Sequence, residues 1–93
     1  MKTVKGVTST GFKYEIDPEN LEDFYLLELF GQSQKGDVAA LSQLIEKMFG
    51  AEQKAALLKH CEDDKGRARL SRIGDEIADV YKFMSTEKKL KNS

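Results

Sequence analysis

The feature that most constrains the fold is an amphipathic stretch near the end of the chain, residues 70–84. Its apolar residues recur at intervals of three and four, which places them on one side of an α-helix; they are Leu70, Ile73, Ile77, Val80, Tyr81 and Met84. The charged residues between them are expected to face water; they are Arg72, Asp75, Glu76, Asp79 and Lys82. Because such a helix is stabilised mainly by packing of its apolar side, the rest of the chain must supply the surface that covers it.

Two short strands are expected at the N-terminus. Residues 3–8 and 12–17 have strand-like composition, and Ser9-Thr10-Gly11 between them is typical of a turn. The second strand alternates, so that its apolar residues share one face; they are Phe12, Tyr14 and Ile16. A lone hairpin is only marginally stable in water, so we expect this face to pack on the helices or on another subunit.

Three further helices are expected before residue 70. The first begins at Pro18 with Asp17 as its N-cap, the second spans 38–49 and ends at Gly50, and the third spans 51–61. The sequence thus predicts a mainly α (α+β) fold in one domain, with a β-hairpin over 1–17, about four helices in a bundle over 18–87 and a flexible tail over 88–93. We expect the core to contain Phe12, Ile16, Phe24, Leu41, Ile45, Met48, Leu58, Ile73, Ile77 and Val80.

The composition indicates a small protein of a reducing compartment. The chain has 93 residues, a net charge of −1 and a single cysteine, Cys61, so we expect no disulfide and a cytoplasmic location. It has no stretch of apolar residues long enough for a membrane span. Charge is distributed unevenly, with six acids and no base over 15–28, and eight bases against four acids from Lys65 onwards. Such polarity favours head-to-tail self-association or a charged partner.

No pattern in the sequence indicates an enzyme, a cofactor site or a metal site. His60 and Cys61 are too few to hold zinc, and adjacent helical residues do not converge on one ion. The grouped carboxylates Asp75, Glu76 and Asp79 are interpreted as a solvated helix face, because acid–base catalysis also needs a cleft. We therefore expect no catalytic, cofactor-binding or metal-binding residues.

The first helix carries more apolar residues than one neighbour can cover. We therefore expect a protein-binding or self-association surface on it, formed by Tyr25, Leu26, Leu29 and Phe30, and a homo-oligomer as the result.

A basic segment, Arg67 to Arg72, is the best candidate for contacts with nucleic acid. Its arginines are suited to phosphates, but it has no aromatic neighbours for base stacking and follows the acidic run 62–64. Nucleic-acid binding is therefore not favoured.

Five short segments follow one another along the chain: GFKYEID at 11–17, MFGAEQ at 48–53, LLKHCED at 57–63, KGR at 65–67 and EIADVY at 76–81. In this order they resemble the tail assembly chaperones of long-tailed phages and prophages of Gram-positive bacteria, over residues 10–93. The resemblance implies a non-enzymatic chaperone that binds the tape measure protein and recruits tail tube subunits. It also implies action in the host cytoplasm and absence from the mature virion. Two alternatives remain: a small phage-encoded DNA-binding regulator that uses the basic segment Arg67 to Arg72, and a head–tail completion protein of the virion.

Overall fold

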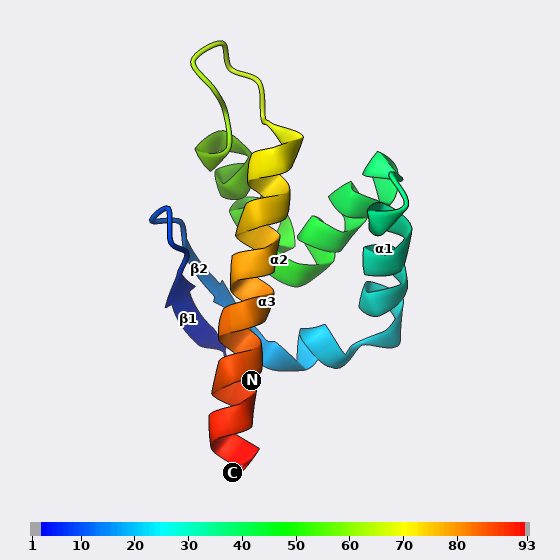
Figure 1. The fold of residues 1–93 in the computed structure, drawn as a ribbon, viewed down its shortest axis with the longest axis vertical. Coiled ribbons are helices and arrows are strands. Elements are labelled where there is room, and N and C mark those ends of the chain that lie inside the picture. The colour runs from blue at the N-terminus through cyan, green and yellow to red at the C-terminus, as the bar shows by residue number, and fades with distance from the viewer. Residues whose placement is uncertain (1–2, 93) are drawn as a thin grey trace.

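A β-hairpin is followed by a short 3₁₀ helix and three α-helices in the computed structural model, which describes the backbone of residues 3–92 and the side chains of residues 3–84 (Figure 1). The elements are β1 (Val4–Val7), β2 (Lys13–Ile16), η1 (Pro18–Glu22), α1 (Phe24–Gln34), α2 (Val38–His60) and α3 (Leu70–Asn92). The predicted class, mainly α with an N-terminal hairpin, is confirmed.

The hairpin turns one face towards the helices, as its alternation predicts. Phe12, Tyr14 and Ile16 are buried, and Phe49 of α2 meets the rings of both Phe12 and Tyr14 edge-on, with centroids 6.1 and 6.2 Å apart. Gly6 pairs with Tyr14 across the strands, and a Cβ at Gly6 would clash with the hydroxyl end of the Tyr14 ring. A glycine is therefore needed in β1 so that the Tyr14 side chain can lie across it.

The segment after the hairpin differs from the expected single helix. Asp17 caps only the 3₁₀ helix η1, and Asp23 then caps α1 by accepting a hydrogen bond from the Tyr25 N–H at 2.9 Å. Because Asp23 has an extended backbone, it separates the two helices and redirects the chain. Phe24 becomes the first residue of α1 and is 70% exposed, so its assignment to the core is wrong. Leu26, which is fully buried, occupies the core instead.

The second and third predicted helices form one element, α2, with a kink at the predicted break. Gly50 has φ 83° and ψ 166°, a conformation that is essentially restricted to glycine. The Gln53 side chain stabilises the bend, because its amide nitrogen donates to the carbonyl oxygens of Phe49 and Glu15 while its oxygen accepts from the Glu15 N–H. The kink is thereby tied to β2.

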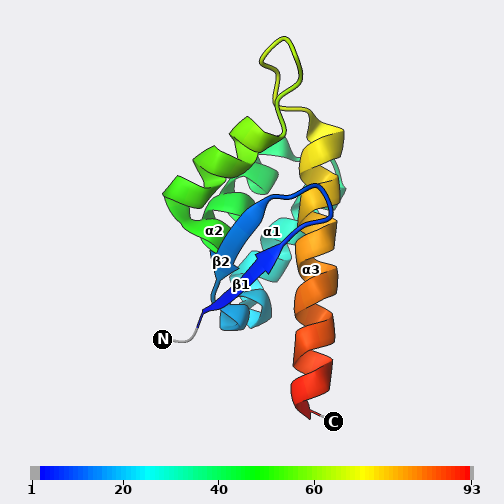
Figure 2. The same cartoon turned by 90° about the vertical axis from the view of Figure 1, so that its left-hand side faces the viewer.

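Helix α3 continues to Asn92, beyond the end expected between Met84 and Glu87. The predicted flexible tail over 88–93 coincides with its last turns, and its side chains and Ser93 lie outside the described residues. The hairpin and α1 pack on opposite sides of α2 and α3 (Figures 1 and 2). The predicted core residues that the structure buries between these layers are Phe12, Ile16, Ile45, Met48, Ile73, Ile77 and Val80, whereas Leu41 and Leu58 are half-buried against them.

Candidate binding surfaces

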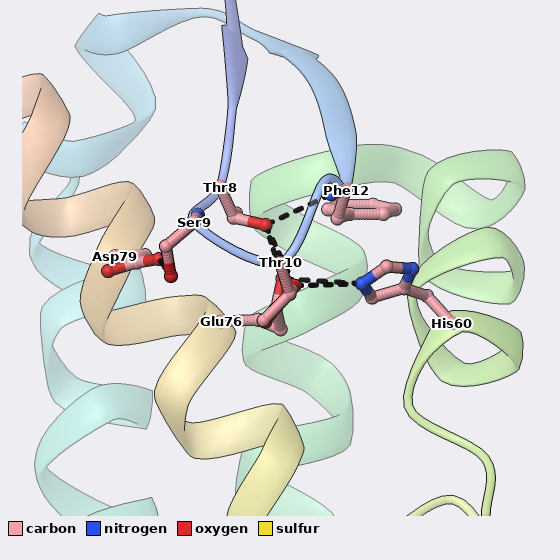
Figure 3. Close-up of polar contacts among 7 residues, drawn as sticks. All are labelled: Thr8, Ser9, Thr10, Phe12, His60, Glu76 and Asp79. Carbon is pink, nitrogen blue, oxygen red and sulfur yellow. Dashed lines mark hydrogen bonds and ion pairs between the residues drawn. The ribbon is translucent and has the colours of Figure 1, made fainter.

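Three hydroxyl groups in the hairpin turn bind two carboxylates of α3 (Figure 3). The hydroxyls of Thr8 and Thr10 each donate to Glu76 at 2.7 Å, and the backbone N–H and hydroxyl of Ser9 donate to Asp79 at 2.9 and 2.7 Å. Glu76 is only 3% exposed, so the prediction that it faces water is wrong. The Ser9 hydrogen bonds lower the pKa of Asp79 below its ordinary value. We call this arrangement the turn clasp.

His60, the last residue of α2, completes the turn clasp. Its Nε2 lies 2.9 Å from the Thr10 hydroxyl, and its ring lies 5.5 Å from that of Phe12 (Figure 3). Because the Thr10 hydroxyl hydrogen is directed to Glu76, His60 is the donor in this contact. These hydrogen bonds fix the hairpin turn to both α2 and α3. The neighbouring Cys61 is buried, and this burial raises the pKa of its thiol.

An apolar hollow lies between α1 and α3, with α2 forming its floor. It measures about 540 Å³, and we call it the central groove; it is lined by Phe30, Ser33, Gln34, Leu41, Leu44, Gly74, Ile77, Ala78 and Tyr81. Two small residues one turn apart, Gly74 and Ala78, form part of the α3 wall and leave room beside it. The ring of Phe30 on the α1 wall packs against the ring of Tyr81 on the α3 wall, with centroids 5.2 Å apart.

The hydroxyl of Tyr81 is buried beside this groove. Among the residues that the structure describes it has no hydrogen-bond partner, and burial raises its pKa. A buried hydroxyl without a hydrogen-bond partner destabilises the folded state. The wall of the central groove therefore contains a hydrogen-bonding group that no described residue satisfies.

The four residues predicted to form a surface on the first helix do not lie together. Tyr25 is 69% exposed, whereas Leu26 is fully buried in the core and cannot contact a partner. Leu29 and Phe30 are half-buried against the core, and Phe30 also lines the central groove. Which side of α1 faces the protein follows from its packing on α2, which the run of apolar residues does not specify.

The exposed apolar side chains of α1 are instead Phe24, Tyr25 and Leu27. Their exposed fractions are 70%, 69% and 44%, and the rings of Phe24 and Tyr25 pack edge-on with centroids 6.3 Å apart. We call these three residues the aromatic tab.

A second apolar hollow lies between the two arms of the kinked α2 and the start of α3. It measures about 310 Å³, and we call it the elbow pocket; it is lined by Val38, Leu41, Ser42, Ile45, Lys54, Leu58, Ala68, Leu70 and Ile73. Val38 and Leu70 are 62% and 58% exposed, so apolar surface continues from the pocket to the outside.

Asp63 holds together the loop that contains the basic segment and precedes α3. The Asp63 carboxylate accepts hydrogen bonds from the backbone of Lys65 and Arg67 and from the side chains of Arg67 and Arg69. These contacts lower the pKa of Asp63 to about 2. Two of the arginines considered for phosphate contacts, Arg67 and Arg69, therefore bind Asp63 within the fold. Their side chains nevertheless remain 59% and 51% exposed.

The turn clasp is not predicted from the sequence, because Ser9 and Thr10 are typical of a turn, and Glu76 and Asp79 are typical of a solvated helix face. The signal that could have identified Glu76 is its position, three residues after Ile73 and four before Val80, on the apolar stripe itself. A carboxylate there requires hydrogen-bond donors, and the Thr8-Ser9-Thr10 run near the N-terminus is a source of hydroxyls.

Within the described residues, no cluster of three or more histidines, cysteines or carboxylates is arranged to hold a metal ion. None of the helices in the same part of the chain combines the length and hydrophobicity needed to cross a membrane. Comparisons with models of protein families, with curated proteins and with solved structures find no match to this chain.

Proposed function

We propose that this protein is a non-enzymatic phage tail assembly chaperone that binds an amphipathic helix of the tape measure protein in the central groove. The observation that carries the proposal is the groove itself, an apolar channel with one wall from α1, the other from α3 and a floor from α2. The order of sequence phrases that resembles tail assembly chaperones supports the choice of partner.

The walls of the central groove suit a helix more than a small polar ligand. Apolar side chains dominate the lining, and Ser33 and Gln34 supply polar groups along the α1 side. Helix-in-groove recognition uses such a surface, because apolar anchors of the bound helix enter the groove while its polar side stays in water. Gly74 and Ala78 permit a close approach of the bound backbone.

A chaperone of this kind acts by covering apolar surface until assembly. A tape measure protein is long and helical, and its apolar stripes favour aggregation while they are exposed. In the proposal, the groove covers one such stripe in the host cytoplasm, and tail tube subunits are recruited to the complex.

The test is co-expression with the tape measure protein encoded in the same phage or prophage genome. We expect the wild type to keep the tape measure protein in the soluble fraction and to co-purify with it. Ala78→Arg, which fills the central groove, should abolish both effects. Ala55→Arg is the matched control, because Ala55 is exposed on α2 and lines neither hollow. Equal solubility with and without the chaperone would contradict the proposal.

A further inference from the structure

The aromatic tab and the elbow pocket lie at opposite ends of α1. Phe24 is the first residue of this helix, whereas Val38 follows its last turn after a short loop (Figure 1). With 11 residues, α1 is about 16 Å long at about 1.5 Å per residue. One copy of the chain therefore presents a protruding apolar group and an apolar recess at separate places.

The charges around these two surfaces are opposite. Residues 15–28, which include the tab, carry six acids and no base, and Lys47 is the base that pairs with Asp23, at 3.1 Å. The loop beside the elbow pocket, residues 62–72, carries four bases and three acids. One of these acids, Asp63, is only 9% exposed, whereas the Arg67 side chain that it binds is 59% exposed. The loop next to the pocket therefore has a net charge of +1, and the side chains of Arg67 and Arg69 are exposed on it.

We propose that the aromatic tab of one copy inserts into the elbow pocket of a second copy. The hollow of about 310 Å³ can receive the Phe24 ring, and Val38 and Leu70 at its mouth extend the apolar contact to Tyr25 and Leu27. Opposite charges around the two surfaces favour this orientation.

The charge distribution disfavours a tab-to-tab or a pocket-to-pocket dimer. A contact of tab with tab would bring two acidic regions together, and a contact of pocket with pocket would bring two basic loops together. A single tab-to-pocket contact joins two different surfaces, so one copy of the pair keeps a free tab and the other keeps a free pocket. Further copies can bind to these surfaces, and the association continues into a ring or an open chain. The central groove is occupied in neither copy, so this inference does not depend on the proposed function.

Two variants that each lose one side of the contact test the proposal. Phe24→Ser removes the ring that is proposed to enter the pocket, and Leu70→Asp places an acid at the pocket mouth, where it repels the acidic tab region. Both residues are exposed first residues of α-helices, where serine and aspartate are tolerated. Circular dichroism and thermal unfolding check that each variant folds, and Ala55→Arg serves as the surface control.

Sedimentation velocity measures the result. We expect wild type and Ala55→Arg to form species larger than dimers as concentration rises, whereas each tab or pocket variant alone stays monomeric. An equimolar mixture of the two variants should form a dimer and nothing larger, because it contains one intact tab-to-pocket pair. A monomeric wild type, unchanged association of either variant or a mixture that stays monomeric would overturn the proposal, with no tape measure protein involved.

Discussion

Replacing Glu76 by glutamine should destabilise the protein by about 2–3 kcal/mol. Glu76 is 3% exposed and accepts hydrogen bonds from Thr8 and Thr10, each at 2.7 Å. A hydrogen bond to a charged group contributes about 1.5–3 kcal/mol. Glutamine keeps the shape but removes the charge from both bonds and replaces one acceptor oxygen with an amide group that donates. The Thr8 hydroxyl has little freedom to compensate, because it already accepts from the Phe12 N–H.

Equilibrium unfolding in urea measures this loss, with Asp75→Asn as the control. Asp75 neighbours Glu76 on α3 but is exposed, so its replacement should change the free energy of unfolding by less than about 0.5 kcal/mol. In Glu76→Gln, faster hydrogen exchange at the Phe12 amide should accompany the loss, because that amide is bonded to Thr8. A loss below about 0.5 kcal/mol, with unchanged exchange in the hairpin, would refute the role assigned to the turn clasp.

Three further predictions concern the helices and the loop before α3. Gly74→Ala should raise the free energy of unfolding by about 0.5–1 kcal/mol, since Gly74 is helical and an added Cβ meets no atom within 4 Å; urea unfolding checks this. Gly50→Ala should lower it by about 1–3 kcal/mol in the same assay, because Gly50 has φ 83°. The folded state depresses the pKa of Asp63 to about 2, so its stabilising contribution is complete above the unfolded value of about 3.9 and is lost as the pH falls from about 4 to 2. Unfolding measured across that range should show a weaker pH dependence for Asp63→Asn than for the wild type.

Features set by short-range chemistry could be predicted from the sequence. The alternation of Phe12, Tyr14 and Ile16 identified the buried face of β2, and Asp37 caps α2 as its position indicates. Gly50 marked the position at which the helix changes direction. Each of these depends on a residue and its immediate neighbours, so a local pattern is sufficient.

Features set by the relative placement of distant segments could not be predicted. The helix assigned from Pro18 is divided because Asp23 acts as a second cap, and either aspartate alone is compatible with the sequence. Glu76 meets Thr8 across 68 positions of the chain, and no local pattern reports such a contact. The surplus of apolar residues in α1 was detected, but which of them are exposed depends on how α1 packs against α2.

Site-specific crosslinking can test whether the central groove binds a helix of the tape measure protein. A photoreactive phenylalanine analogue at position 78 lies in the groove, and the same analogue at position 55 lies on the exposed side of α2. After irradiation of co-expressing cells, we expect a crosslink from position 78 to an amphipathic segment of the tape measure protein, and none from position 55. A tape measure protein that crosslinks only from position 55, or equally from both positions, would show that the central groove is not its binding site.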